Sequence, residues 1–216
     1  MIYIQGFKIT MDNKLITTPT SLMDLNDITG LPIPMITYTD LKHVKKLTDL
    51  VHPTSPAIYI LIDFNRDDGQ ISGHWTLLSL FDEQNEDGQV EYSLSYFDSY
   101  GKPVDGEMNR IPKEYIRKYY KSKDVLTKLV KQSAKQELNI KYIDYNSHKY
   151  QLDYTSVCGR YCAYFLICAI KHGVSTDVFD TETFYDILKK NMDEYRQEYN
   201  INGKIEWDEL ILWLTQ

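Results

Sequence analysis

The chain has 216 residues, 43% of them hydrophobic and 25% charged, with a formal net charge of −7 and a pI near 5.2. This composition is that of a globular protein large enough to form a core, and the acidic balance argues against a general nucleic-acid-binding module. The longest strongly apolar run, Tyr161–Ile170, is well short of the roughly 20 residues that a membrane span needs, so we expect neither a membrane span nor a signal peptide.

The N-terminal part of the chain predicts short elements. Residues 1–20 predict an irregular arm or a short strand. Ser21–Ile28 predicts a short helix with a serine at its N-cap and Gly30 as its stop signal. A longer helix is predicted to begin at Asp40 and to end before Pro53. Its buried face comprises four apolar residues at helical spacing: Leu41, Val44, Leu47 and Val51.

Three strands are predicted in the middle of the chain. Ala57–Phe64 is a nearly continuous apolar run, which is typical of a strand buried on both faces. Trp75–Phe81 and Val90–Asp98 follow, and the latter alternates in hydrophobicity with a period of two. An Asp-Gly pair between these two strands favours a hairpin, so we expect them to pair in antiparallel order.

The second half of the chain is predicted to be mainly helical. In chain order the elements are helices over Asn109–Tyr120 and Lys123–Leu138, a strand over Asn139–Tyr150, a buried helix from Cys158, a helix over Thr181–Asn191 that extends toward Tyr199, and a closing helix over Glu206–Leu214. Together they define an α+β fold, in which a mixed or antiparallel sheet of about four to five strands is flanked by helices. We expect one domain over residues 1–216, with a helical subregion over 1–53 and the main core over 54–216.

The stretch Gln151–Gly173 joins a polar, turn-prone run to an apolar helix, and Cys158 is the first residue of that helix. A thiol at this point lies among unpaired N–H groups and at the positive end of the helix dipole, which stabilises its thiolate. We therefore interpret Cys158 as a nucleophile. Cys162 and Cys168 lie inside the helix and are interpreted as packing residues. Three cysteines this close together do not resemble a disulfide framework, which indicates a reducing compartment.

His74 begins the first strand of the predicted hairpin, and Asp98 ends the second. Antiparallel pairing brings the start of one strand beside the end of the next, so both side chains are expected at the same edge of the sheet. An imidazole held by a carboxylate is the usual activator of a thiol nucleophile, because the carboxylate orients the ring and favours the imidazolium form. We interpret His74 as the general base and Asp98 as its orienting partner.

Gln151 lies in the polar run ahead of Cys158. Its side-chain amide is a candidate donor to a developing oxyanion, with the backbone N–H of Cys158 as the second donor. Gly159 leaves room for a substrate carbonyl to approach the sulfur. Taken singly, these residues have ordinary explanations as a buried thiol, a structural histidine, a turn aspartate and a surface glutamine. The interpretation depends on their joint order along the chain.

Two metal sites are considered and rejected. Residues 63–74 place carboxylates as a calcium loop does, but Asp68 stands where that loop needs glycine, and His74 stands where it needs glutamate. Cys158 and Cys162 are spaced as half of a zinc site, but no second Cys/His pair at ligand spacing completes it. We therefore expect no metal and no other resident cofactor.

Three segments, in this order, resemble cysteine peptidases of the adenovirus-protease and SUMO-protease type: GHWTLLSL, YFDSYG and QLDYTSVCGRYC. The resemblance extends from about Ala57 to Cys168 and implies a papain-type core. It implies the same catalytic set: His74, Asp98, Cys158 and Gln151. It also implies that Trp75 packs beside the histidine and that Trp75 and Gly159 belong to the substrate cleft.

The resemblance implies an endopeptidase that cuts protein substrates after small residues, such as Gly-Gly or Gly-x-Gly. The chain is small and resembles both the adenovirus-protease and the SUMO-protease type. This implies a maturation protease of a DNA virus or virophage, which cuts capsid precursors in the host cytoplasm or in the virion. Val157 departs from the aspartate that SUMO proteases carry there. A peptide or DNA activator would also follow from the resemblance, but no cysteine precedes Cys158 to form the disulfide that joins the adenovirus enzyme to its peptide. The acidic balance weakens the DNA alternative.

Three alternatives stay open at this point. A deconjugating peptidase for ubiquitin-like proteins would use the same residues. An acetyltransferase on the same scaffold would keep a histidine, an acid and a cysteine. An inactive module that binds Gly-Gly tails would not need them, and the intact set of four residues argues against it.

Overall fold

The computed structural model describes residues 18–65, 71–84, 87, 90–120, 122–136, 138–172 and 179–216. Its centre is a five-stranded sheet with the order β1-β2-β3-β4-β5. The strands are β1 (Met35–Thr37), β2 (Ala57–Asn65), β3 (Ile71–Gln84), β4 (Val90–Phe97) and β5 (Ile140–Tyr145). β2, β3 and β4 are antiparallel to one another, whereas β1 runs parallel to β2 and β5 runs parallel to β4. The predicted α+β class with a mixed sheet is therefore confirmed.

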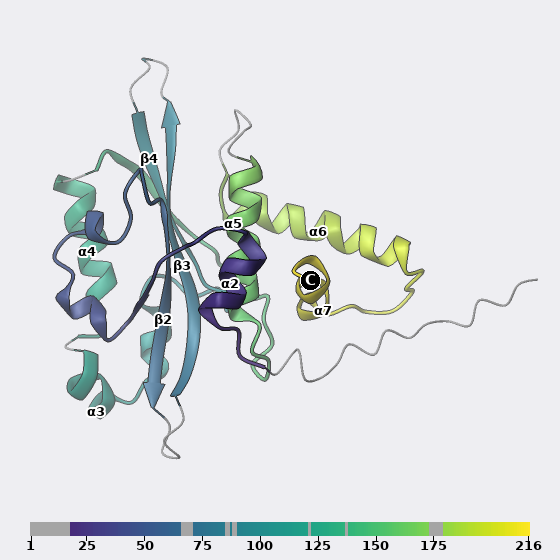
Figure 1. Cartoon of the computed structure of the whole chain (residues 1–216), viewed down its shortest axis with the longest axis horizontal. Helices are drawn as coiled ribbons and strands as arrows, with labels where there is room; N and C mark the ends of the chain where they lie inside the picture. The colour runs from purple at the N-terminus through teal and green to yellow at the C-terminus, as the bar shows by residue number, and fades with distance from the viewer. Residues whose placement is uncertain are drawn as a thin grey trace, which may run out of the picture.

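The helical elements lie on both faces of this sheet. They are α2 (Leu22–Thr29), the 3₁₀ turns η1 (Asp40–His43), η2 (Leu47–Asp49) and η3 (Gly106–Arg110), α3 (Lys113–Tyr115), the π-helical turn η4 (Ile116–Tyr120), α4 (Val125–Gln136), α5 (Cys158–His172), α6 (Thr181–Glu198) and α7 (Trp207–Leu214). Figure 1 shows the sheet nearly edge-on, with α3 and α4 on one side and α2 and α5 on the other. α6 and α7 lie beyond α5 and form an outer layer.

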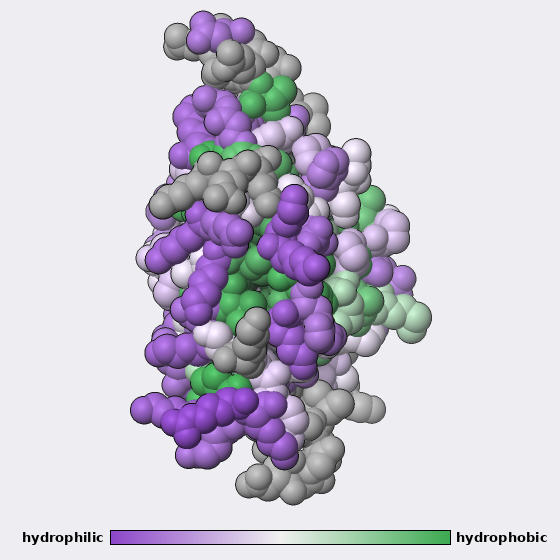
Figure 2. All heavy atoms as spheres, turned by 90° about the vertical axis from the view of Figure 1, so that its left-hand side faces the viewer, coloured by the Kyte–Doolittle hydropathy of each residue, from purple (hydrophilic) through white to green (hydrophobic). Residues whose placement is uncertain are grey.

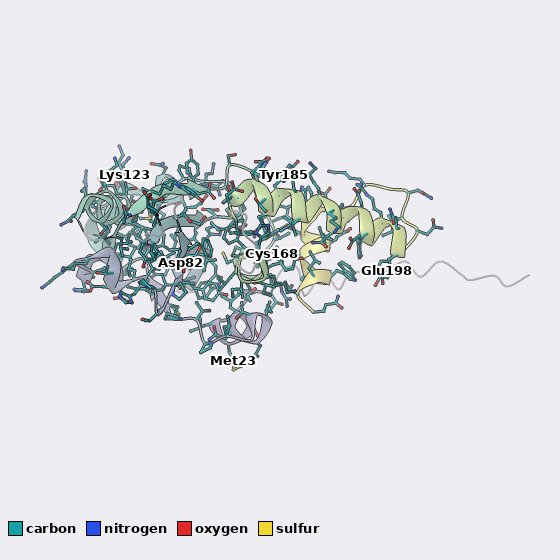
Figure 3. All side chains as sticks on the ribbon, turned by 90° about the horizontal axis from the view of Figure 1, so that it is seen from above. Met23, Asp82, Lys123, Cys168, Tyr185 and Glu198 are labelled. Atoms are coloured by element: carbon teal, nitrogen blue, oxygen red, sulfur yellow. The ribbon has the colours of Figure 1, made fainter. Side chains whose placement is uncertain are left out.

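Alternation along the strands divides the core into two clusters. Tyr59 of β2 packs toward α5, whereas its neighbours Ile58 and Ile60 pack toward α4. α5 is buried on most of its surface because it lies between the sheet and the outer helices. Seen from above, Cys168 of α5 lies in the interior, while Met23 and Glu198 lie toward the periphery (Figure 3).

α4 covers the other face of the sheet as an amphipathic helix. Its buried side chains recur at helical spacing: Leu126, Leu129, Val130 and Ser133. The outer surface on this side is mainly hydrophilic, with a central strip of hydrophobic residues (Figure 2). The predicted helix over Lys123–Leu138 is confirmed at slightly shorter length.

The N-terminal predictions are partly right. α2 carries the predicted serine cap, in which Ser21 and Asp24 form a capping box, and Gly30 follows it with a φ of 68°. The single helix predicted from Asp40 is wrong, because the segment forms only η1 and η2. Between them the chain is extended at Lys46, where the Asp49 carboxylate accepts the backbone N–H. Strand β1, which was not predicted, makes this region part of the sheet. Residues 1–17 lie outside the described part.

The helix predicted over Asn109–Tyr120 is also wrong. Pro112 lacks a backbone N–H and disfavours helical geometry at the residue before it, and Ile111 is extended with φ −87° and ψ 133°. The segment is therefore divided into η3, α3 and η4. β5 is shorter than the predicted strand over Asn139–Tyr150. The middle of the rejected calcium loop, residues 66–70, lies outside the described part.

Candidate active site

The end of the β3–β4 ladder brings two of the predicted site residues together. The last pair of this ladder is Leu77 with Phe97; β3 extends past it through His74, and Asp98 directly follows β4. His74 was predicted to begin its strand, but it lies inside β3, which begins at Ile71 and pairs His74 with Ile62 of β2. His74 Nε2 lies 3.0 Å from Asp98 Oδ1, and both side chains are buried. The juxtaposition expected from antiparallel pairing is therefore present in the structure.

Cys158 reaches the same place from the first position of α5. The backbone N–H of Trp75 lies beyond the end of the β3–β4 ladder, and it donates to Cys158 Sγ at 3.5 Å. The Cys158 sulfur also lies close enough to His74 to raise the pKa of the imidazole. Nε2 of the ring contacts Asp98, which leaves Nδ1 for a second partner. The order of groups is thus carboxylate, imidazole and thiol.

The electrostatics of this set favour a charged pair. Burial of the His74 ring opposes its protonation, but the Asp98 carboxylate and the Cys158 sulfur outweigh burial and raise the pKa of His74 to about 10. The sulfur lies at the N-terminus of α5, where the helix dipole and free N–H groups favour a thiolate. At neutral pH these neighbours stabilise the imidazolium form of His74 beside the sulfur.

Asp98 is held in place by residues that the sequence analysis did not assign. Its backbone N–H donates to Asn146 Oδ1 at 2.8 Å, and Asn146 Nδ2 donates back to the Asp98 carbonyl at 2.7 Å. The backbone N–H of Tyr100 donates to Asp98 Oδ1 at 2.8 Å. Asn146 is fully buried just after β5, so it continues the hydrogen bonding of the sheet with its side chain.

Gln151 is buried next to the site, and its amide is oriented by two contacts. Ser99 Oγ donates to Gln151 Oε1 at 2.6 Å, and Gln151 Nε2 donates to the carbonyl of Thr155 at 2.8 Å. The second contact fixes which end of the amide is the nitrogen, because a backbone carbonyl only accepts. Within the part of the chain that the structure describes, no hydrogen bond joins Gln151 directly to Cys158, and the second N–H of its amide has no protein acceptor.

Trp75 and Gly159 contact each other beneath α2. Trp75 is buried, and its indole N–H donates to the carbonyl of Thr20 at 2.8 Å. A methyl group on Gly159 would lie 2.8 Å from Leu25 Cδ2 and 3.1 Å from Trp75 Cδ1. The glycine therefore lets α2 approach α5 closely, a packing reason that differs from the expected room for a substrate carbonyl. The assignment of Trp75 and Gly159 to a substrate cleft stays a prediction.

Tyr100, to which the sequence assigned no role, covers the imidazole of His74. Its ring stacks on that of His74 with centroids 4.8 Å apart and an interplanar angle of 25°. Arg110 and Lys149 lie near the same tyrosine ring. Tyr100 belongs to the YFDSYG segment, in which the sequence assigned a role to Asp98 alone.

The remaining cysteines have a different environment. Cys162 and Cys168 are both buried as free thiols, and Cys162 donates to the carbonyl of Trp75. Burial raises the pKa of the Cys162 thiol well above its usual range and that of Cys168 to about 12. Both are therefore neutral packing residues at physiological pH. Among the described residues, no group of three or more metal-ligating side chains converges.

No protein-family model matches the chain, and no curated protein is significantly similar to it in sequence. Among solved structures, the Legionella pneumophila effector protein RavZ, residues 1–487, matches with a TM-score of 0.34 and 15% identity. That match covers 59% of this chain and 32% of the other. A similarity this low assigns neither family nor function. Within the described part, no helix is both long and apolar enough to cross a membrane.

Proposed function

We propose that the protein is a cysteine peptidase with Cys158 as the nucleophile, His74 as the acid–base residue and Asp98 as the orienting carboxylate. The observation that carries this proposal is that the buried His74 ring, the Asp98 carboxylate at its Nε2 and the Cys158 sulfur lie together at one edge of the sheet. A thiol at a helix N-terminus beside such a ring is an activated nucleophile.

The reaction follows from these positions. The Cys158 thiolate attacks the carbonyl carbon of the peptide bond, and a tetrahedral oxyanion forms. The C–N bond then breaks as the His74 imidazolium gives its proton to the leaving amine, and a thioester remains on Cys158. Neutral His74 next takes a proton from water, whose oxygen attacks the thioester. The C–S bond breaks, the acid product leaves, and the imidazolium–thiolate pair is restored.

Gln151 is proposed as a donor to the oxyanion, together with the backbone N–H of Cys158. Support comes from the contact with the Thr155 carbonyl, which only accepts and therefore orients the amide with its nitrogen as the donor. One N–H of that nitrogen is used by Thr155. The other is available to a tetrahedral intermediate once substrate is bound.

The substrate proposed is a protein with small residues, such as Gly-Gly or Gly-x-Gly, before the scissile bond. Cys158 is only 6% exposed and His74 only 8%, so a thin backbone without side chains reaches the sulfur most easily. The resemblance of the sequence to viral maturation proteases favours capsid precursors of a DNA virus as substrates, in the host cytoplasm or the virion. Removal of ubiquitin-like proteins from their conjugates is the alternative, and the same site would perform it.

The decisive experiment is labelling by a Gly-Gly vinyl electrophile followed by peptide cleavage. Native protein should be labelled at Cys158 alone, and Cys158→Ala should lose both labelling and cleavage of a Gly-Gly-x peptide. Cys168→Ala is the matched control and should keep both, because the Cys168 thiol is buried and protonated. Equal labelling of all three cysteines, or of none, contradicts the proposal. Transfer from acetyl-CoA without hydrolysis would favour a transferase instead.

A further inference from the structure

The ring of Tyr100 forms a wall of the site on the side of His74. It is stacked on the imidazole at 4.8 Å, and its backbone is tied to Asp98 by a hydrogen bond of 2.8 Å. His74 is buried, whereas Tyr100 is partly exposed. A substrate group that approaches the imidazole from solvent therefore passes this ring.

Two cations from separate segments converge on the same ring. Arg110 Cζ lies 5.0 Å from the centroid of the Tyr100 ring, and Lys149 Nζ lies 5.8 Å from it, within the range of cation–π contacts. Arg110 comes from η3, and Lys149 comes from the segment between β5 and α5. The formal net charge of the whole chain is −7. Two cations therefore meet at one ring of a chain that is acidic as a whole.

Each of these two cations has an acidic neighbour, so a carboxylate is the kind of group that binds beside them. Lys149 Nζ lies 2.8 Å from Asp153 Oδ1, and Arg110 Nη1 lies 3.5 Å from Glu107 Oε2. The side chains of Lys149 and Arg110 are 47% and 49% exposed, and that of Asp153 is 68% exposed. The Lys149–Asp153 pair is exposed at both ends and therefore weak, whereas the Glu107 side chain is only 7% exposed. A carboxylate from another molecule can therefore join or replace Asp153 beside these cations.

The proton transfer from His74 indicates which part of a peptide substrate lies beside Tyr100. His74 gives its proton to the amine that leaves, so this amine and the residues after it lie on the imidazole side of the cleft. We propose that Tyr100, Arg110 and Lys149 form a subsite for an acidic side chain in the first residues after the scissile bond. This inference rests on the proposed peptidase function and adds a substrate preference to it.

The test compares matched peptides that carry Gly-Gly before the scissile bond and either Glu or Gln at the first or second position after it. Of the two Glu peptides, the one that native protein cleaves faster should have a kcat/KM about threefold to tenfold above that of the peptide with Gln at the same position, measured at low salt. High salt should reduce this ratio. Arg110→Gln and Lys149→Gln should each lower the Glu:Gln ratio toward one. Lys190→Gln on α6, which makes the same charge change, is the control and should keep the ratio.

The outcomes separate the two proposals. If native protein cleaves Glu and Gln peptides at equal rates, or if the ratio survives in both Arg110→Gln and Lys149→Gln, the subsite is refuted while the peptidase function stands. If neither peptide is cleaved and the vinyl electrophile labels no cysteine, the peptidase function itself fails, and the subsite fails with it.

Discussion

The imidazole of His74 is held by three groups of different chemistry. A carboxylate lies at Nε2, the Cys158 sulfur lies near the ring, and the Tyr100 ring covers one face. The stacked ring excludes water from that face, so the attraction between the imidazolium and its two anionic neighbours is weakly screened. Burial by itself would favour the neutral ring. The protonated state therefore depends on Asp98 and Cys158 and not on solvent.

Asp98→Asn tests this dependence through pH. The native imidazolium should keep its proton up to about pH 10, so the alkaline limb of kcat/KM should lie near that pH. Asparagine removes the carboxylate charge that raises the pKa of His74, so the limb should move to lower pH. The value of kcat should also fall, on the order of 10²–10⁴-fold, because the ring loses its orienting acceptor. pH–rate profiles of both proteins measure these effects, and an unmoved alkaline limb would count against the role of Asp98.

The pairing of His74 with Asp98 could be predicted from the sequence, because it follows from the antiparallel order of two adjacent strands, although β3 begins at Ile71 and not at His74. The support of Asp98 by Asn146 could not. The two residues are 48 positions apart, and their contact requires β5 to lie beside β4, a parallel pairing that no local pattern specifies. Tyr100 was missed for a related reason, since the stack depends on how the chain turns after β4.

Asn146→Ala should reduce both the stability and the activity of the protein, because Asn146 holds Asp98 in place. The substitution leaves the N–H and carbonyl of Asp98 without their partners in a buried place, which should lower the free energy of unfolding by about 2–3 kcal/mol. It also releases Asp98, so kcat should fall about tenfold to a hundredfold with little change in KM. Asn139→Ala, at an exposed site, is the control. Urea unfolding and steady-state kinetics give both quantities, and reduced stability with native kcat would restrict Asn146 to a structural role.

At the scale of elements, the sequence was most informative where periodicity was strong. β2, β4 and α7 were predicted within a residue or two of their observed bounds, and α5 begins at the predicted residue, because a single continuous or alternating pattern defines each one. The failures lie where polar side chains or proline compete with the helix: Asp49 caps η2, and Pro112 interrupts the segment before α3. Apolar spacing predicted burial of Leu41, Leu47 and Val51 correctly even though the helix was wrong.

Gly159→Ala tests how α2 packs on α5. The added methyl group would lie 2.8 Å from Leu25 Cδ2, so α2 must shift or Leu25 must change rotamer, which should cost about 1–3 kcal/mol of stability. Gly203→Ala is a matched control, because nothing lies within 4 Å of a methyl group there. Combining Gly159→Ala with Leu25→Ala should show a favourable coupling energy in a double-mutant cycle. Additive effects in urea unfolding would mean that the two residues do not compete for the same space.

At the scale of the whole molecule, segments from most of the chain meet near Cys158. β3 and β4 supply His74 and Asp98, the segment after β5 supplies Gln151, and α2 covers Trp75. The outer helices also contribute, because α7 contacts both α5 and the segment that precedes it. A site assembled from so many segments should lose its geometry when any layer moves, which links reactivity at the sulfur to packing at the far side of α5.

Asp208 of α7 is the residue through which this link can be measured. Its Oδ1 accepts from the Tyr161 hydroxyl at 2.8 Å, and its Oδ2 accepts from the Leu152 backbone N–H at 3.2 Å. Asp208→Ala would leave these two donors without acceptors, lowering the free energy of unfolding by about 2–4 kcal/mol. It should also slow electrophile labelling of Cys158, since the segment that carries Gln151 loses its anchor. Asp193→Ala, exposed on α6, should change neither quantity. If labelling keeps its native rate while stability falls, α7 supports the core without positioning the site.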